Sequence, residues 1–371
     1  MEVYVRRIEI TNSGDSHYVL FMVWLILRRR LSRNPALREP AHVYDLCPLS
    51  HPSHTARSLN SSRAWTCRGL SVRDDPIVSV VLGTYNRLPF LKTTIKSVRH
   101  EVASISHEIT VVDGGSTDGT LPWLVTQKDI TAIVQHNHGT WRGRAVERRS
   151  WGHFMNLGFK CAQGKFILMI SDDCLLVPDS IANGVRQFET MLAAGRKVGA
   201  VAFYWRNWPE QEDYWVGLTL GDKMFVNHGL FLRSAVANVG WIEEDIYHFY
   251  HADGDLCLKL WEAGWEVVDC PDAFVEHCLY TSPETREIGV STQPADWQAY
   301  LKRWSGVFYD PNTHNIGGWL HRSFQDAHDT VKNFPRRSLL ILATRKAKAF
   351  LIVAARKATH SIRQALQPRL N

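Results

Sequence analysis

Polar and acidic side chains gather in three short stretches in the first half of the chain. They are Thr84, Tyr85, Asn86, Asp113, Asp172 and Asp173. Carboxylate and amide groups can accept hydrogen bonds from a nucleobase and from ribose hydroxyls. Two adjacent carboxylates can also hold Mg²⁺ or Mn²⁺, hard cations that prefer oxygen ligands and bridge phosphates. This chemistry requires the three stretches to meet in the folded chain.

Each stretch follows an apolar run that is typical of a buried parallel strand. The runs cover residues 77–82, 109–112 and 166–170 and are rich in β-branched residues. Segments with apolar residues at helical spacing, such as 88–98 and 151–161, lie between them. This alternation predicts an α/β sheet with right-handed crossovers, in which ligands bind at the carboxyl ends of the strands. Asp and Gly are also common turn residues, but three such sites in order favour a binding site.

Three segments closely resemble the family 2 glycosyltransferases of GT-A fold. They are Val78–Asn86, Glu108–Thr120 and Asn156–Asp173. The resemblance is strong over residues 77–178 and continues more weakly to about residue 277. It implies a mostly parallel α/β sheet flanked by helices. It also implies an inverting, metal-dependent enzyme that transfers a sugar from a nucleoside-diphosphate sugar to a glycan or lipid-linked acceptor in cell-surface polysaccharide or glycolipid synthesis.

The resemblance assigns a role to each polar residue of the first half. Thr84, Tyr85, Asn86 and Asp113 would bind the nucleobase. Asp172 would contact the ribose. Asp173 would coordinate Mg²⁺ or Mn²⁺.

The second half of the chain supplies the expected catalytic base. Where the family usually has Glu-Asp-x-Asp-Leu, this chain has Ala252-Asp-Gly-Asp-Leu256. Asp253 matches the base that takes the proton of the acceptor hydroxyl, and Asp255 is the alternative. Asp255 could instead be an acid that interacts favourably with a helix N-terminus. His277 follows a short strand and is a candidate metal ligand.

Two further groups of residues are candidates for substrate contacts. Many relatives have an Arg where this chain has His153, and four arginines upstream could bind the diphosphate or form a solvated loop. A second group of aromatic residues could form a platform for an acceptor sugar or pack in the core. The arginines are Arg142, Arg144, Arg148 and Arg149; the aromatic residues are Phe203, Tyr204, Trp205, Trp208, Tyr214 and Trp215.

Two other functions are consistent with the same fold. A nucleotidyltransferase that makes a nucleotide-sugar would be expected to have a Gly-rich basic loop after the first strand, and residues 83–87 do not match one. A non-catalytic sugar- or membrane-binding module would not need Asp172, Asp173 and Asp253. The change to Ala252 keeps this second alternative open.

Composition is typical of a globular protein, with 45% hydrophobic and 22% charged residues among 371. The seven cysteines form no CxxC pair, which indicates free thiols in a reducing compartment, and their spacing does not favour zinc. No motif indicates nucleic-acid binding.

We expect four regions along the chain. Residues 1–75 form a poorly structured leader with a short apolar segment, 76–280 the GT-A domain, 281–335 an extension, and 336–371 a basic amphipathic helix. No acidic residue follows Asp329, so the last helix could bind an anionic membrane, or it could pack on the domain with solvated charges. The first alternative predicts a cytoplasmic protein, peripheral on the inner face of the membrane. The apolar segment 18–27 is either an interfacial anchor or a packed helix.

Overall fold

The computed structural model describes residues 4–6, 76–137, 139–278, 283–313 and 316–335, all within one compact unit. The apolar segment 18–27 and the basic helix 336–371 lie outside these residues. Among the described residues, no helix combines the length and the apolar character needed to cross a bilayer.

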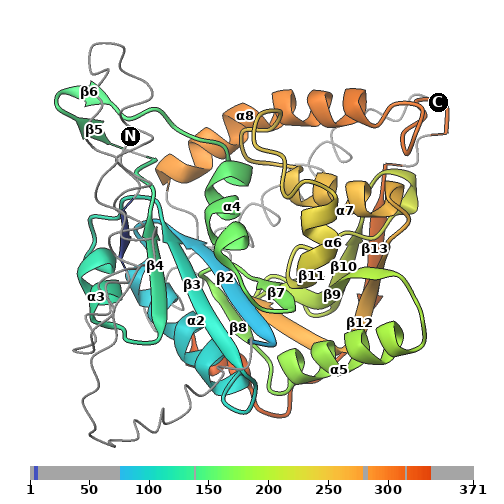
Figure 1. The fold of residues 1–371 in the computed structure, drawn as a ribbon, viewed down its shortest axis with the longest axis horizontal. Coiled ribbons are helices and arrows are strands. Elements are labelled where there is room, and N and C mark those ends of the chain that lie inside the picture. The colour runs from blue at the N-terminus through green and yellow to red at the C-terminus, as the bar shows by residue number, and fades with distance from the viewer. Residues whose placement is uncertain (1–3, 7–75, 138, 279–282, 314–315, 336–371) are drawn as a thin grey trace, which may run out of the picture. The chain divides into compact units, whose positions relative to one another are not determined.

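One mixed sheet forms the centre of the unit (Figure 1). Its main path runs in the order β1-β4-β3-β2-β7-β11-β9-β10-β13, and β12 pairs with both β9 and β8. The bounds are β1 (Tyr4–Arg6), β2 (Val78–Thr84), β3 (His107–Asp113), β4 (Ile130–Val134), β7 (Phe166–Met169), β8 (Cys174–Leu176), β9 (Val198–Asn207), β10 (Tyr214–Leu218), β11 (Gly229–Leu232), β12 (Glu266–His277) and β13 (Gly318–Arg322). A separate two-stranded hairpin contains β5 (Thr140–Trp141) and β6 (Arg144–Ala145).

The predicted α/β fold class is confirmed, and the expected parallel pairing holds for part of the sheet. Strands β4, β3, β2 and β7 are parallel neighbours, as are β9 and β12. The prediction of a mostly parallel sheet is wrong for the rest, because β11 runs antiparallel between β7 and β9, and β10 and β13 are antiparallel as well. β11 has four buried residues, and so short an apolar run carries no sign of its direction.

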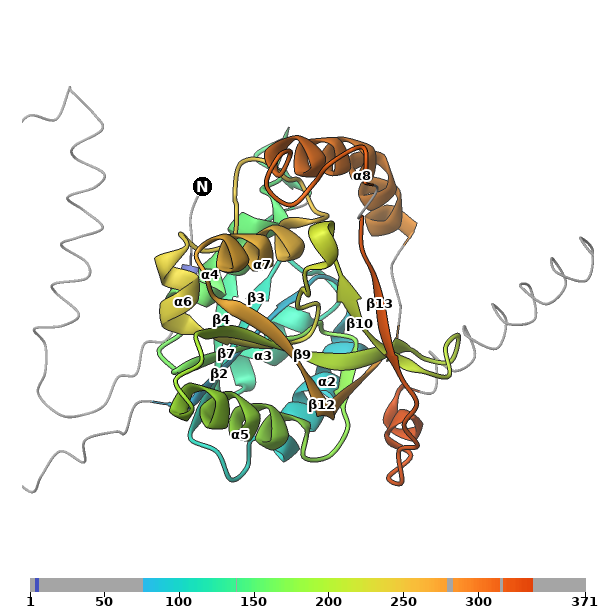
Figure 2. The same cartoon turned by 90° about the vertical axis from the view of Figure 1, so that its right-hand side faces the viewer.

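Helices cover both faces of the sheet. Figure 2 shows α2 and α5 on one side and α4 and α7 on the other, with α8 beyond α7. The helices are α2 (Leu88–Glu101), α3 (Thr120–Thr126), α4 (Trp151–Cys161), α5 (Ser180–Ala193), α6 (Arg233–Asn238), α7 (Ala252–Glu262) and α8 (Pro283–Arg303), with short 3₁₀ turns at Leu220–Asp222 and Thr330–Asn333. The expected helices and strands of the first half are therefore present, within a few residues of their predicted ends.

Local sequence explains where the two helices nearest the strand ends begin. Pro89 stands in the first turn of α2, where a missing N–H costs nothing. Ser150 caps α4, and its hydroxyl accepts a hydrogen bond from the His153 amide at 3.0 Å. Gly158 lets α4 lie close to the sheet, because a Cβ there would be 2.5 Å from Val81. These features bring the start of α4 to the edge where β2 and β3 end.

The region after residue 280 contributes to the same unit. Helix α8 packs beside α7, and β13 pairs with β10 over five residues. The strand that carries His277 is long: β12 runs from Glu266 to His277, with a register irregularity between Cys270 and Phe274.

Candidate active site

The predicted polar residues of the first half meet at one edge of the sheet. Thr84 ends β2, Asp113 ends β3, and Asp172 and Asp173 follow β7, the parallel neighbour of β2. All four are buried. Because parallel strands end on the same side, their carboxyl ends form one polar patch in an otherwise apolar core.

One carboxylate oxygen of Asp113 accepts hydrogen bonds from the protein, and the other does not. Its Oδ1 accepts hydrogen bonds from the amides of Gly115 and Ser116, both at 2.8 Å. Its Oδ2 is buried and has no hydrogen-bond partner among the described residues, and burial raises the pKa of this carboxyl. A buried acceptor without a donor costs free energy. A donor N–H from a ligand would satisfy it.

Tyr85 and Asn86 connect the loops after β2 and β3. The Tyr85 ring packs on Gly114, where an added Cβ would be 3.2 Å from it. Asn86 adopts the left-handed conformation, with φ +53°, that Asn tolerates better than most residues. Its side-chain oxygen accepts from the Thr117 amide at 2.7 Å. Asn86 therefore orders the loop that carries Asp113, beside any contact with a ligand.

Asp172 and Asp173 share one cation from the protein itself. Arg87 Nη1 donates to Asp172 Oδ1 at 2.8 Å and to Asp173 Oδ2 at 3.0 Å. Thr84 Oγ1 donates to Asp172 Oδ2 at 2.7 Å. Burial raises the pKa of Asp172 to about 6, against the charge of Arg87. Sequence reasoning missed Arg87, although its position three residues after the strand end Thr84 could have suggested it.

Asp173 also faces His277. Burial favours the protonated form of Asp173, but the charges of His277 and Arg87 outweigh it and lower its pKa to about 2. His277 Nδ1 lies 2.7 Å from Asn207 Oδ1, so Nδ1 donates and Nε2 points at Asp173 Oδ1, 3.3 Å away. In neutral imidazole this places two lone pairs opposite each other. A proton or a metal ion relieves that repulsion.

Two residues that the sequence did not indicate complete this cluster. The ligand atoms of Cys174, His228 and His277 all lie within 4.8 Å of one another. His228 is buried, which lowers its pKa to about 3 and keeps its imidazole neutral, the form that binds metals. With Asp173 they make a set of oxygen, nitrogen and sulfur donors, and these residue types fit a divalent metal ion. Sequence spacing gave no sign of zinc-type ligands, because Cys174 and His228 are more than fifty residues apart.

The structure separates the two candidates for the catalytic base. Asp253 is part-exposed in the first turn of α7, where Asn227 Nδ2 lies 3.4 Å from its Oδ2. Asn227 directly precedes His228, so Asp253 contacts a residue that is adjacent in the chain to the metal-ligand cluster. Burial raises the pKa of Asp253.

Asp255 is fully buried and has three partners. It accepts from Tyr247 Oη at 2.9 Å and from Trp304 Nε1 at 3.0 Å, and it pairs with Arg303 Nε at 2.9 Å. These contacts join α7 to α8. Asp255 is therefore a structural residue.

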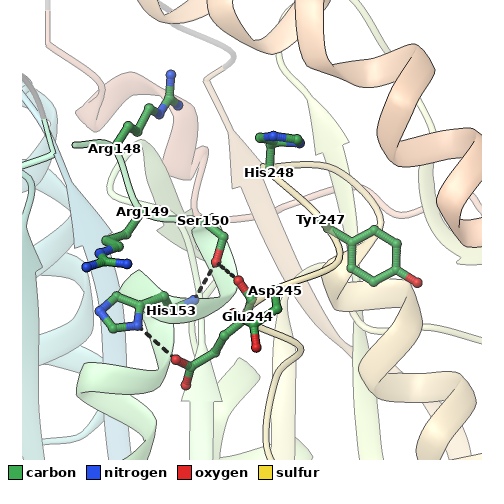
Figure 3. Close-up of a pocket in the computed structure, with 8 residues that line it drawn as sticks. All are labelled: Arg148, Arg149, Ser150, His153, Glu244, Asp245, Tyr247 and His248. Carbon is green, nitrogen blue, oxygen red and sulfur yellow. Dashed lines mark hydrogen bonds and ion pairs between the residues drawn. The ribbon is translucent and has the colours of Figure 1, made fainter.

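A cavity of about 200 Å³ lies beside the start of α4 (Figure 3). His153 lines it and its Nδ1 lies 2.8 Å from Glu244 Oε2, while Ser150 donates to the Glu244 carbonyl at 2.6 Å. Arg148 and Arg149 are also among the residues that line it (Figure 3). Arg142 and Arg144 lie in or next to the β5–β6 hairpin. The position where relatives have an arginine is thus occupied by an imidazole paired with a carboxylate.

Comparison with known proteins places the strand-end residues within a family. The model of glycosyl transferase family 2 matches residues 79–232, a region that contains Thr84, Asp113, Asp172 and Asp173. This region is a family 2 glycosyltransferase domain. The predicted GT-A plan is confirmed by the topology, in which β4, β3, β2 and β7 are parallel neighbours, and by this match.

Relatives outside the family model share only part of this chain or little of its sequence. An uncharacterised glycosyltransferase from Rickettsia conorii is 32% identical over 116 residues, which are 30% of this chain and 17% of that protein. A mannosyltransferase from Pyrobaculum calidifontis, solved with GDP-Man and Mn²⁺, is 17% identical, with a TM-score of 0.47 over 95% of this chain and 90% of its own. S. aureus TarS, solved with UDP-GlcNAc, is 15% identical, with a TM-score of 0.41; the match covers 56% of this chain and 60% of the TarS chain. We draw no conclusion about substrate from these likenesses.

Proposed function

We propose that this domain transfers a sugar from a nucleoside-diphosphate sugar to an acceptor hydroxyl, with inversion at the anomeric carbon. One observation carries the proposal. Asp172 and Asp173 meet Arg87 and His277 at the strand edge, and Asp253 is connected to the same place through Asn227. Candidate nucleotide acceptors, metal ligands and a base therefore adjoin, the acceptors within the region that matches the family 2 model.

The nucleotide end of the donor would lie at the ends of β2 and β3. Asp113 Oδ2 can accept from a nucleobase N–H, since it has no other hydrogen bond. The part-exposed Tyr85 beside it offers an aromatic face. Asp172 is already oriented by Thr84, so its carboxylate is prepared to accept from ribose hydroxyls.

A divalent ion would be held by Asp173 and His277, with His228 and Cys174 within reach. When bound, it would neutralise the charge that develops on the departing diphosphate. The imidazoles favour a transition ion such as Mn²⁺ over Mg²⁺, which prefers oxygen ligands alone. Arg87 provides a fixed positive charge at the same carboxylates, so the pair is never left without a cation.

Asp253 would act as the base. The acceptor oxygen attacks the anomeric carbon with its lone pair, the bond from that carbon to the diphosphate oxygen breaks, and the diphosphate leaves with the electron pair. The acceptor proton passes to the Asp253 carboxylate. Burial raises the pKa of Asp253, which makes its carboxylate a stronger base than an ordinary aspartate.

A donor screen tests the proposal. It measures release of nucleoside diphosphate from UDP-, GDP- and dTDP-sugars with Mg²⁺, Mn²⁺, Co²⁺ or Zn²⁺. We expect turnover of at least one donor. The rate should be higher with a transition ion than with Mg²⁺, and Asp173→Ala should abolish turnover. Asp272→Ala is the matched control, because that carboxylate is 77% exposed and lies in another part of the unit. Absence of release and of metal-dependent nucleotide binding with every donor would exclude the transferase.

We also propose that residues 336–371 bring the domain to an anionic membrane on the cytoplasmic side, where the acceptor would be made. The support is their charge: basic residues continue to Arg369, and none is acidic. Deleting this segment should abolish binding to phosphatidylglycerol vesicles and leave binding to neutral vesicles unchanged. Unchanged binding to both would contradict this role.

A further inference from the structure

A row of aromatic side chains crosses one face of strands β9, β10 and β13. Trp205 pairs in register with Trp215, which pairs with His321 on the other side. The ring centroids of Trp205 and Trp215 are 4.8 Å apart, and those of Trp215 and Trp319 only 3.8 Å. Alternate residues of a strand share a face, so Trp319 and His321 both lie on the side of Trp215. We call Trp205, Trp215 and Trp319 the tryptophan row.

One end of the tryptophan row touches the candidate metal ligands. The Trp205 ring stands edge to face with the rings of His228 and His277, at centroid distances of 5.6 and 5.7 Å. His277 contacts Asp173 in turn. The row therefore starts at the place where the sugar would be transferred.

The other end of the row is open to solvent. Trp319 is 45% exposed and His321 is exposed as well. Figure 2 shows β13 alongside β10, at the margin of the sheet. A path of aromatic faces thus leads from the surface to the candidate active site.

Core packing accounts for Trp205 at the inner end of this row, but not for Trp319 at its outer end. The opposite face of the same strands forms the core, where Tyr214 and Phe324 pack on Phe274. A tryptophan that is nearly half exposed gains little from burial, and aromatic residues in binding sites characteristically combine an apolar face with a polar edge. The indole N–H of Trp215 is buried and has no acceptor among the described residues. A ligand hydroxyl could supply that acceptor.

These features fit a chain of pyranose sugars. A pyranose ring has a face of C–H groups that stacks on an indole and an edge of hydroxyls that makes hydrogen bonds. The Trp215 and Trp319 rings lie against each other, with centroids 3.8 Å apart, so together they offer one stacking surface, along which further sugar units could extend toward Trp205. The polar atoms of the three tryptophans are indole nitrogens, and His321 lies opposite Trp215; none of these four described residues is a lysine or arginine that would hold a lipid phosphate.

We propose that the tryptophan row is the acceptor site and that the acceptor is a glycan of several sugar units. Its acceptor end would lie beside Trp205 and its remainder would extend over Trp215 to Trp319. This inference rests on the proposed transferase function, and it specifies the class of acceptor that the enzyme uses.

Direct binding tests the row independently of turnover. The full chain is titrated with hexasaccharides of β-1,4-glucan, β-1,3-glucan, chitin and α-mannan and with the matching monosaccharides, and intrinsic tryptophan fluorescence and calorimetry report binding. At least one hexasaccharide should bind, more tightly than its monosaccharide. Trp319→Ala should raise its Kd roughly tenfold, and Trp319→Phe should recover part of the loss.

Leu320→Ala is the matched control. Leu320 is 38% exposed, adjacent to Trp319 in β13, and directed to the opposite face by the strand alternation. It should leave the Kd unchanged. Donor hydrolysis without acceptor should be the same in the wild type and Leu320→Ala.

Several results would overturn the assignment. The first is that no hexasaccharide binds. The second is that Leu320→Ala weakens hexasaccharide binding as much as Trp319→Ala does. The third is that Trp319→Ala weakens only the binding of phosphatidylglycerol vesicles, which would indicate a lipid acceptor. Glycan binding through Trp319 in a protein that hydrolyses no donor would support the row and reject the transferase. Failure of one proposal is therefore distinguishable from failure of the other.

Discussion

Arg87 determines the electrostatics of the candidate active site. Two buried carboxylates next to each other repel, so without a nearby positive charge at least one of them would take up a proton. The Arg87 guanidinium lies between them and donates to both. Its side chain is only 19% exposed, so solvent screens this interaction weakly.

Replacing Arg87 should make the protein depend on metal for stability. In Arg87→Met the pair Asp172–Asp173 loses its partner, and the free energy of unfolding at neutral pH should fall by about 3 kcal/mol. The loss should shrink toward pH 5, because the unpaired carboxyls take up protons. Mn²⁺ should raise the melting temperature of the variant more than that of the wild type.

Arg99→Met removes an exposed partner of Asp129 and should cost less than ~1 kcal/mol. Equal metal effects in wild type and Arg87→Met would contradict this account.

Substitution of Asp253 should mainly lower the catalytic rate, whereas substitution of Asp255 should mainly lower stability. Asp253→Asn should lower kcat by about 10²–10⁴-fold and leave nucleotide affinity unchanged. Asp255→Asn should mainly lower stability, because its partners Arg303, Tyr247 and Trp304 join two helices. Urea unfolding and steady-state kinetics of both variants separate the two effects. A fully active Asp253→Asn enzyme would require another base.

The pH dependence should reflect the environment of Asp253. Burial raises its pKa above the ordinary value of 3.8. The base works when deprotonated, so kcat/KM should fall as pH decreases through this raised pKa and the profile should show an acid limb. The limb should vanish in Asp253→Asn. An acid limb that persists in the variant would belong to another group.

At the scale of elements, the start of α4 is fitted closely to the loop before α7. A Cβ on Gly152 would lie 1.9 Å from the Glu243 carbonyl oxygen, which is backbone and cannot rotate away. Ser150 and Asn156 on the same helix bond the neighbouring Glu244 and Ile242 carbonyls. Helix α4 is therefore held in one position relative to the strand ends.

Gly152→Ala tests this fit. Helix propensity alone would favour alanine by about 1 kcal/mol. The clash should outweigh it and give a net loss of about 1–3 kcal/mol in the free energy of unfolding, measured by urea. Gly318→Ala is the control, since a Cβ there meets nothing within 4 Å, and it should have little effect. A neutral Gly152→Ala would show that α4 can shift.

Strand β12 brings the second half of the site to the first. Glu276 is buried and accepts from both Arg206 Nε and Nη2, at 2.9 and 2.8 Å, and from Tyr214. These bonds join β9, β10 and β12 on one side of the sheet. The next residue, His277, then points to Asp173 on the other.

At the scale of the whole unit, nucleotide and metal should stabilise the fold together. A ligand at one hundred times its Kd adds about 2.7 kcal/mol, and for a domain of this size that corresponds to roughly 5–10 °C. UDP or GDP with Mn²⁺ should therefore raise the melting temperature by several degrees in the wild type and in Asp272→Ala. Asp173→Ala should lose the part that depends on Mn²⁺. An equal shift in all three proteins would place the metal elsewhere.

Local signals in the sequence determined the strands β2, β3 and β7, the helices that follow them, and the polar residues at their ends. Strand periodicity and turn chemistry depend on neighbours in sequence, and a parallel arrangement puts strand ends together. For that reason Thr84, Asp113, Asp172 and Asp173 could be named before the fold was known. Their roles toward a donor were taken from a family resemblance and remain predictions.

Only the tertiary structure decided which distant groups join them. Arg87 binds Asp172 and Asp173, which follow it by 85 and 86 positions in the chain. His228 reaches Cys174 only because β11 runs antiparallel beside β7. The choice between Asp253 and Asp255 depended on Arg303, far along the chain. The tryptophan row likewise needed β13 to pair with β10. Such contacts are set by strand order and register, which no short stretch of sequence contains.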